Sequence, residues 1–394
     1  MRYLAADVVY PIVGFPINKG VVAVDDDNRI VSVGELSDYP GKPFEYFNGA
    51  LVPGFVNTHC HLELSHMLGK IPTGTGLALF INQVVGTRGF ADQAIIQTAI
   101  ERADRLMYEA GIVAVGDISN TTDTAAVKAA SPMCYYTFVE MFDFMQPDRA
   151  AATFEQYEAV YAAFAQQLGD RDRLQRVPHA PYSVSPALYA RINAANAPGG
   201  TVSIHNQETP GEQALFRNKT GDLLALFEQF GMSYDHFEAT GRSSIQQALD
   251  HLDPAQRTLF VHNTLTSHAD IEAAQAWSDQ VYWATCPNAN LYIENRLPNY
   301  QFFLDTGAKM TIGTDSLTSN WQLSVLEELK TIARYQSYLS TETLLQWATL
   351  GGAEALGMDQ ELGSFEPGKR PGVNLITLDG QDQIGEESTV RRLV

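Results

Sequence analysis

Hydrophobic and polar positions follow two different patterns along this chain of 394 residues. Apolar and polar side chains alternate at short intervals near the N-terminus, and residues 20–35 predict two short strands joined by a turn rich in aspartate. From about residue 360 the chain again shows short strand-like runs between glycines and prolines. We therefore expect residues 1–50 and 360–394 to form one small, β-sandwich-like unit.

Residues 51–359 instead alternate short apolar runs with amphipathic helical segments, which is typical of parallel βα units. Eight strand–helix units of this kind predict an α/β fold, a (β/α)₈ barrel of the TIM type. A doubly wound open sheet is the alternative, but no glycine-rich phosphate-binding motif follows the first strand. The expected strands are 51–59, 111–118, 134–142, 174–180, 201–206, 257–262, 280–285 and 309–315. The expected helices include 93–110, 149–169, 222–230 and 321–334.

The charge and the cysteine content exclude several classes of function. Because 26 basic side chains face 46 acidic ones, the formal net charge is −20, which repels nucleic acids and anionic membrane surfaces. No stretch approaches about 20 uninterrupted apolar residues, and the N-terminal residues lack the pattern of an export signal. Cys60, Cys134 and Cys286 are too few for a disulfide framework or a cysteine-based zinc finger. We expect a cytoplasmic protein that acts on a small molecule.

The first strand of the expected barrel ends in a His-x-His motif formed by His59 and His61. Residues two apart in a strand point to the same side, so both imidazoles can approach one ion. The carboxyl ends of barrel strands are also where active sites lie. By itself the motif fits two ordinary histidines on a half-exposed strand better than it fits a metal site.

Further histidines and one aspartate stand at the ends of other expected strands. His205 ends the fifth strand, His262 ends the sixth, and Asp315 ends the eighth. In a closed barrel these ends form one ring, so the side chains converge although they are distant in sequence. Imidazoles and a carboxylate can hold one divalent metal with a position open for water. Zinc is the metal we expect, and Fe²⁺ stays open because the same ligands serve both.

Together these motifs resemble the amidohydrolase superfamily, in its branch of cytosine-deaminase-like and chlorohydrolase-like enzymes. The resemblance covers essentially the whole chain. It rests on residues 53–61 (PGFVNTHCH), on His205 with Glu208 as an H-x-x-E motif, on Val261–His262, and on residues 313–316 (GTDS). Supporting stretches are residues 179–183, 286–290 and 363–369. The tail departs from the family pattern, because residues 370–374 read RPGVN where relatives commonly carry an Ala-Asp pair.

The resemblance implies one metal held by His59, His61, His205 and Asp315, with His262 contacting the reacting water. Relatives with two metals carry a modified lysine after the fourth strand, whereas residues 176–179 read RVPH here, which favours a single metal. A divalent metal lowers the pKa of a bound water from 15.7 toward about 7.

The catalytic roles implied for the acids are proton transfers. Asp315 would accept the water's proton with the help of His262. Glu208 would protonate a ring nitrogen of the substrate and then pass a proton to the leaving amine. Glu208 also fits a carboxylate placed at the start of a helix near its dipole.

The substrate-binding residues are suggested by the segment after the first strand. Residues 61–65 (HLELS), followed by GTGL at 74–77 and by Arg88, look like relatives that deaminate 6-aminodeoxyfutalosine, an adenine-bearing nucleoside. Glu63 would bind ribose hydroxyls or a ring nitrogen, Arg88 a carboxylate, and His179 the substrate. Glu63 and Arg88 equally fit solvated surface roles, and His179 also fits a structural one. Glu140 would reach the pocket or lie at its rim.

We thus expect a hydrolase of non-peptide C–N bonds: a metal-dependent deaminase of an adenine-type nucleoside such as 6-aminodeoxyfutalosine. A second interpretation is an enzyme that opens a cyclic amide or expels chloride by the same water attack. A third is a non-catalytic scaffold with this fold, although such proteins usually lose ligands that are all present here. A homodimer is possible, because barrels of this kind often dimerise.

Overall fold

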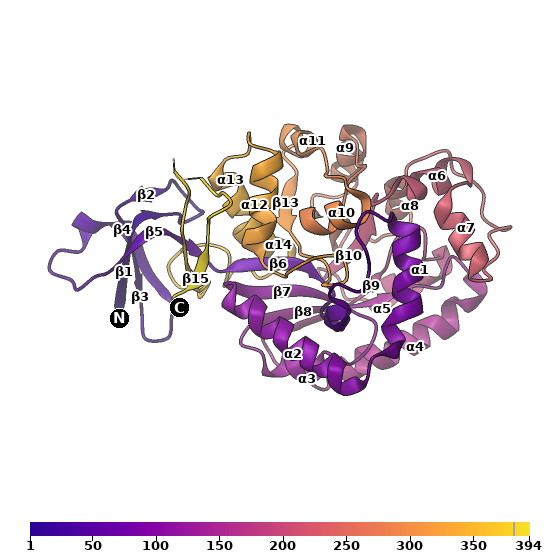
Figure 1. Ribbon diagram of the computed structural model, residues 1–394, viewed down its shortest axis with the longest axis horizontal. Coiled ribbons are helices and arrows are strands. Elements are labelled where there is room, and N and C mark those ends of the chain that lie inside the picture. Colours follow the sequence, from indigo (N-terminus) through magenta and orange to yellow (C-terminus); the bar gives the residue numbers. More distant parts are fainter. Residues whose placement is uncertain (381–382) are drawn as a thin grey trace.

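The computed structural model describes residues 1–380 and 383–394 and shows a small β-sheet beside a larger α/β body (Figure 1). The small sheet has seven strands in the order β15-β14-β5-β1-β3-β4, with β2 paired to β1. Strands from both ends of the chain therefore share one sheet. Their bounds are β1 (Arg2–Val9), β2 (Ile17–Asn18), β3 (Gly20–Val24), β4 (Ile30–Glu35), β5 (Glu45–Pro53), β14 (Val373–Ile376) and β15 (Val390–Arg392).

The strand pair expected over residues 20–35 is confirmed as the antiparallel pair β3–β4. Asp25 forms the turn, since its carboxylate accepts the backbone N–H groups of Asp27 and Arg29. Alternate side chains of the sheet pack into a separate apolar core that includes Leu4, Val22 and Leu375. The alternation read from the sequence thus places alternate side chains in this core, while Val8, Ala50 and Val52 pack into the core of the larger body.

Eight parallel strands form the larger body, in two four-stranded sheets ordered β6-β7-β8-β9 and β10-β11-β12-β13. The sheets meet at both edges. Cys60 forms a parallel bridge with Asp315 at one edge, and at the other the N–H of His205 donates to the carbonyl of His179 over 2.9 Å. The bounds are β6 (Phe55–Cys60), β7 (Ile112–Ser119), β8 (Cys134–Met141), β9 (Arg173–Pro178), β10 (Thr201–Asn206), β11 (Arg257–His262), β12 (Val281–Thr285) and β13 (Lys309–Ile312).

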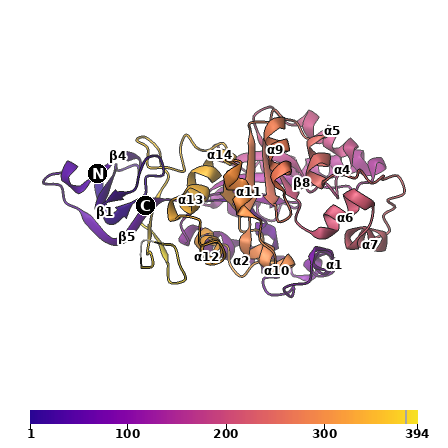
Figure 2. The ribbon, with the colours of Figure 1, turned by 90° about the horizontal axis from the view of Figure 1, so that it is seen from above.

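Helices cover the outside of these strands (Figures 1 and 2). The α-helices are α1 (Leu77–Thr87), α2 (Gln93–Glu109), α3 (Ala125–Ala130), α4 (Ala150–Ala165), α5 (Pro186–Ala195), α6 (Pro210–Asn218), α7 (Asp222–Gln229), α8 (Ser244–Leu249), α9 (His268–Trp277), α10 (Pro287–Glu294), α11 (Tyr300–Asp305), α12 (Val325–Tyr335), α13 (Thr341–Gln346) and α14 (Gly352–Ala355). Short turns of other helix types are η1 (Leu36–Asp38), η2 (Leu62–Met67), η3 (Arg88–Phe90), η4 (Pro147–Arg149) and η5 (Trp347–Gly351). Among the described residues, no helix has the length and apolar character that crossing a membrane requires.

The expected first barrel strand, 51–59, is wrong as a single element. Its start belongs to β5, where Pro53 pairs with Val373 of the small sheet, and β6 begins only at Phe55. Gly54 forms the join, because a Cβ there would lie 2.5 Å from the carbonyl oxygen of Pro371. We propose that the two units meet at Gly54 rather than at residue 50.

Two further boundaries differ from the sequence pattern. β13 ends at Ile312, and the chain then turns so that Asp315 has a φ of +57°. Helix α12 begins at Val325 rather than at 321, because the side-chain oxygen of Asn320 accepts the N–H groups of Trp321 and Gln322 and holds them in a loop. Both changes lie at the carboxyl end of the last strand, where they shape the candidate site.

Candidate active site

The histidines and the aspartate singled out in the sequence meet at the carboxyl ends of the barrel strands. Ligand atoms of His59, His61 and His205 lie within 4.8 Å of one another, and so do those of His59, His262 and Asp315. Nε2 of His61 lies 3.1 Å from Nε2 of His59 and 3.3 Å from Oδ1 of Asp315. Nε2 of His59 lies 3.7 Å from the same oxygen. Nitrogen and oxygen donors on four separate strand ends therefore converge on one point.

The backbone at two of these strand ends is strained. His262 has a φ of +74° and Asp315 a φ of +57°, a region that side chains with a Cβ rarely adopt. Such conformations cost about 1–3 kcal/mol and persist where the surroundings hold them. Here they turn both side chains away from the strand direction and into the cluster.

Burial sets the charge of the cluster. It lowers the pKa of His61 to about 3 and that of His262 to about 4, so both imidazoles are neutral near pH 7. Burial alone would raise the pKa of Asp315, but a hydrogen bond with His59 and the nearby imidazoles bring it below its ordinary value. Neutral imidazoles beside an ionised carboxylate are the donor set that zinc or Fe²⁺ prefers, so these residues fit a single divalent metal.

Glu208 lies beside the cluster, with Oε1 3.7 Å from Nε2 of His262. Burial raises the pKa of this carboxyl well above its ordinary value, and the charge of Asp315 adds to the effect. A raised pKa favours the protonated carboxyl, which is the form that can donate a proton. Glu212, which the sequence analysis did not single out, accepts the backbone N–H groups of Gln207 and Glu208 and thereby fixes this segment.

Two more supporting residues were missed in the sequence. Oδ1 of Asn290 lies 2.9 Å from Nδ1 of His262, and the hydroxyl of Ser319 donates to Oδ2 of Asp315 over 2.5 Å. Asn290 lies within the stretch 286–290 that supported the family resemblance. The sequence therefore marked this segment, but it did not indicate that Asn290 contacts His262. Ser319 carried no signal, because only the loop after β13 brings it back to Asp315.

Glu140 and His179 lie on the other side of His205. Nδ1 of His205 is 2.9 Å from the carbonyl oxygen of His179 and 3.4 Å from Oε1 of Glu140. Burial raises the pKa of Glu140 to about 8. A carbonyl or carboxylate that contacts Nδ1 in this way fixes the orientation of the imidazole, whose other nitrogen faces the cluster. Ligand atoms of Glu140, His179 and His205 also lie within 4.8 Å of one another.

A cavity of about 100 Å³ opens beside the cluster. Its polar lining includes Glu208 and His179. One wall is apolar and comes mainly from η2, α1 and α10. The apolar and aromatic lining residues are Leu64, Leu77, Phe80, Ile81, Tyr182 and Ile293.

Glu63 and Arg88 are not part of this lining. The carboxylate of Glu63 accepts the N–H groups of Asn120 and Thr121 and an N–H of Arg88 at 3.2 Å. The side chain of Asn120 continues to Glu140, with Nδ2 3.2 Å from its Oε2. Arg88 is thereby linked, through Glu63 and Asn120, to the carboxylate beside His205.

An ion pair buried in the barrel supports the segment after His61. Nζ of Lys128 lies 2.6 Å from Oδ2 of Asp117, and both side chains are fully buried. Oδ1 of Asp117 accepts the N–H of Leu62 over 2.7 Å. The pair therefore fixes the start of η2 directly beside a member of the cluster.

Comparison with known proteins agrees with this geometry. A Helicobacter pylori adenosine deaminase is 27% identical over 87% of this chain and 84% of its own length, and an aminodeoxyfutalosine deaminase of Nitratiruptor is 24% identical over 92% and 86%. The structure of H. pylori aminofutalosine deaminase with methylthio-coformycin superposes with a TM-score of 0.81 at 22% identity, covering all of both chains. A zinc-bound adenosine deaminase from Xanthomonas campestris superposes with a TM-score of 0.73 at 23% identity, covering 96% of this chain and 85% of the other.

These likenesses confirm the predicted barrel fold, in agreement with the contacts that join the two four-stranded sheets at both edges. The amidohydrolase family pattern itself matches residues 50–390, which include every strand of the barrel and every residue of the cluster. This chain belongs to the amidohydrolase family.

Proposed function

We propose that the protein is a metal-dependent hydrolytic deaminase of adenine-type nucleosides such as 6-aminodeoxyfutalosine. The observation that carries the proposal is the position of Glu208, a buried carboxyl with a raised pKa, 3.7 Å from His262 at the edge of the donor cluster. Deamination needs a proton donor at that position, because an amine leaves as ammonia only after it is protonated. The relatives named as deaminases of adenosine and its derivatives support the same reaction.

In this proposal His59, His61, His205 and Asp315 hold one zinc ion, or Fe²⁺ in its place. The bound metal would make a water molecule acidic enough to serve as a nucleophile near neutral pH.

The chain's own residues move the protons. A carboxylate oxygen of Asp315 accepts a proton from the attacking water, and Nε2 of His262 orients that water. Glu208 donates its proton to the ring nitrogen next to C6 of the adenine as the C6–O bond forms. Glu208, now a carboxylate, takes the proton of the new C6 hydroxyl and passes it to the amino group, so that the C6–N bond breaks, ammonia leaves and the C6 carbonyl forms. The proton held by Asp315 then returns to Glu208 through solvent.

The substrate-binding roles follow the cavity. His179 and the apolar wall from α1 would contact the base and the sugar. Arg88 uses one N–H group for Glu63 and is about one-third exposed, which leaves donors for a substrate carboxylate. We assign to Glu63 an indirect role, because its oxygens already order residues 120–121.

Two broader expectations stay proposals as well. We place the enzyme in the cytoplasm, on the sequence features described above. We also propose that it forms a homodimer, as barrels of this kind often do.

The test is release of ammonia from purified protein loaded with zinc. The panel contains adenosine, 5′-deoxyadenosine, 5′-methylthioadenosine and aminodeoxyfutalosine, with a cyclic amide and a chlorinated triazine as alternative substrates. We expect ammonia from at least one adenine nucleoside and little turnover of the alternatives. Hydrolysis of the amide or the triazine without ammonia from any nucleoside would overturn the proposal, and no turnover of any compound would favour a scaffold.

A further inference from the structure

A buried carboxylate on helix α12 joins two segments that support the donor cluster. Glu328 is fully buried, and α12 packs against α10. Its Oε2 accepts the backbone N–H of Asn288, at the start of α10, over 2.9 Å. Its Oε1 accepts Nδ2–H groups of Asn288 over 3.0 Å and of Asn320 over 2.7 Å. One carboxylate therefore binds the start of α10 and the loop after β13 together.

The loop after β13 carries Asp315 and the residues that hold it. Nδ2 of Asn320 donates to Glu328 and also to the carbonyl oxygen of Thr314 over 2.8 Å, next to Asp315. The hydroxyl of Ser319, the residue before Asn320, donates to Oδ2 of Asp315 over 2.5 Å. The contact with Glu328 therefore acts on both sides of the aspartate.

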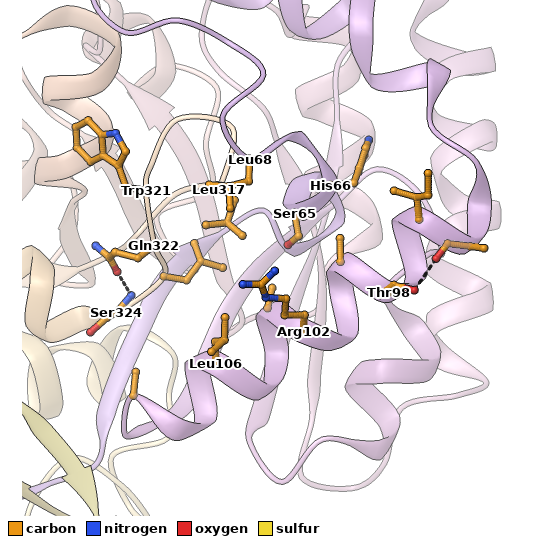
Figure 3. A pocket seen from close by; sticks show the side chains of 16 residues that line it. Ser65, His66, Leu68, Thr98, Arg102, Leu106, Leu317, Trp321, Gln322 and Ser324 are labelled. Carbon is orange, nitrogen blue, oxygen red and sulfur yellow. Dashed lines mark hydrogen bonds between the residues drawn. The ribbon is translucent and has the colours of Figure 1, made fainter.

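The outer side of this loop borders open space. Leu317, Trp321 and Gln322 line a surface groove there, and Trp321 is 58% exposed (Figure 3). The side chain of Gln322 accepts the N–H of Ser324, which is a contact within the loop itself (Figure 3). The position of the loop therefore depends on its inner contacts, and Glu328 is among them.

Helix α10 carries the residue that orients His262. Asn288 is held by Glu328 and also accepts the hydroxyl of Thr331 over 2.6 Å at its Oδ1, so its whole side chain is fixed. Two residues further along the helix, Oδ1 of Asn290 lies 2.9 Å from Nδ1 of His262. The start of α10 therefore determines where this amide meets the imidazole.

Stability alone does not account for a carboxyl group at this position. All three contacts come from N–H groups, so both oxygens of Glu328 act as acceptors. Removing such a group from water offsets much of what its hydrogen bonds contribute, and an apolar side chain of similar size is often as stable. An apolar side chain could not, however, fix the two segments at a defined distance from each other.

We infer that Glu328 is a positioning residue for Asp315 and His262, the two side chains proposed to handle the attacking water. It does not line the cavity, so its effect passes through Asn288 and Asn320. Because one carboxylate holds both segments, changing it alters the placement of the two side chains relative to each other. The role toward water rests on the proposed deamination, whereas the geometry of the cluster can be measured without a substrate.

The test is Glu328→Gln in the full chain. The amide keeps the volume and one oxygen for Asn320, but it places an N–H against the N–H of Asn288. We expect kcat per bound zinc to fall about 10-fold with KM little changed, and zinc binding, measured against a competing chelator, to weaken about 10-fold. The matched control is Glu327→Gln, which removes the same charge from a half-exposed residue paired with Lys330 and should change none of these.

A spectroscopic readout separates positioning from stability. Zinc has a filled d shell, so Co²⁺ is bound in its place as the probe, because its visible absorption depends on ligand geometry. Glu328→Gln should shift the Co²⁺ bands and Glu327→Gln should not. Shifted bands in a protein whose wild type deaminates no nucleoside would support the positioning role and contradict the proposed function. Wild-type bands, zinc affinity and kcat per bound zinc in Glu328→Gln, even with lower stability, would overturn the inference.

A reversed hydrogen bond tests the link between α12 and the loop. Asn320→Asp sets two carboxylates against each other and should weaken zinc binding by about 10-fold or more. Adding Glu328→Gln supplies an amide that can donate to the new carboxylate, while its oxygen accepts the N–H of Asn288, so part of the affinity should return. These variants also decide the question if Glu328→Gln alone does not fold. A double variant that binds zinc no better than Asn320→Asp would contradict the link.

Discussion

Asn290 fixes the ring of His262: its Oδ1 lies 2.9 Å from Nδ1, while Nε2 at the other end of the ring faces Glu208 at 3.7 Å. The amide oxygen accepts the Nδ1–H, so Nε2 is left as an acceptor toward the proposed water. Asn290, on α10, thus determines which ring nitrogen of His262, at the end of β11, carries the proton.

Replacing Asn290 by alanine should lower kcat by about 10–100-fold without removing the metal, because partners of this kind orient rather than bind. Asn290→Asp keeps an acceptor at the same position and should recover part of kcat, with a shift in the pH profile as His262 becomes easier to protonate. Steady-state kinetics with metal analysis check both variants. An unchanged kcat in Asn290→Ala would remove the orienting role.

Replacing Glu208 by glutamine should keep the metal and lower kcat by about 10²–10⁴-fold, the range for loss of a proton-transfer group. The matched control is Glu212→Gln, which alters the neighbouring carboxylate that holds the backbone of residues 207–208. It should cost less activity than Glu208→Gln. Loss of metal from Glu208→Gln would mean that this carboxyl is a ligand instead.

Replacing Arg88 by alanine should raise KM for a substrate that has a carboxylate and have little effect on KM for one that does not. We expect KM for aminodeoxyfutalosine, which offers a carboxylate, to rise at least about 10-fold, the effect of losing one charge-assisted hydrogen bond of about 1.5 kcal/mol or more. KM for 5′-methylthioadenosine should change little. Equal losses for both substrates would show that Arg88 acts only through Glu63 and the loop at residues 120–121.

Replacing Lys128 by methionine should lower the free energy of unfolding by about 3–5 kcal/mol, because it leaves Asp117 buried without its partner. The double variant Lys128→Met with Asp117→Asn removes the charge and retains an acceptor for the N–H of Leu62, so it should recover part of the loss. Denaturant unfolding measures both. A single variant as stable as the wild type would show that the pair contributes little.

The metal-free protein should lose stability in acid through its buried imidazoles. Burial, with the nearby His59 and His262, lowers the pKa of His179 to about 3, against 6.5 when unfolded. Between these values only the unfolded chain binds the proton, so the free energy of unfolding falls as pH drops, by up to about 1.4 kcal/mol per pH unit for this group. Unfolding by urea with a chelator present, from pH 7 to pH 5, measures the slope. His179→Gln should give a shallower slope of the free energy of unfolding against pH than the wild type. Equal slopes would contradict the lowered pKa of His179.

The sequence predicted the position of a residue correctly where a general rule of the fold brings distant residues together. Because parallel barrel strands all end on one face, His205, His262 and Asp315 could be placed beside His59 before any contact was known. The apolar pattern did not show where β5 ends and β6 begins, since the last four residues of β5 and all of β6 are buried and only the close approach at Gly54 separates them.

Partner choice among buried polar residues could not be predicted either. Asn290 and Ser319 reach the cluster only through the packing of α10 and the loop after β13. Glu63 illustrates the reverse case: its place after the first strand suggested substrate contact, whereas its oxygens bind the backbone of residues 120–121. Such pairings depend on loop conformation, which local pattern does not determine.

The central claim is that one metal, held at the four strand ends, supports deamination with Glu208 as the proton donor. The most direct measurement follows ammonia release from an adenine nucleoside while metal is removed by chelation and returned as zinc in steps. We predict that activity disappears without metal and returns in proportion up to one zinc per chain. Full activity in the metal-free protein, or no ammonia at one zinc per chain, would contradict the claim.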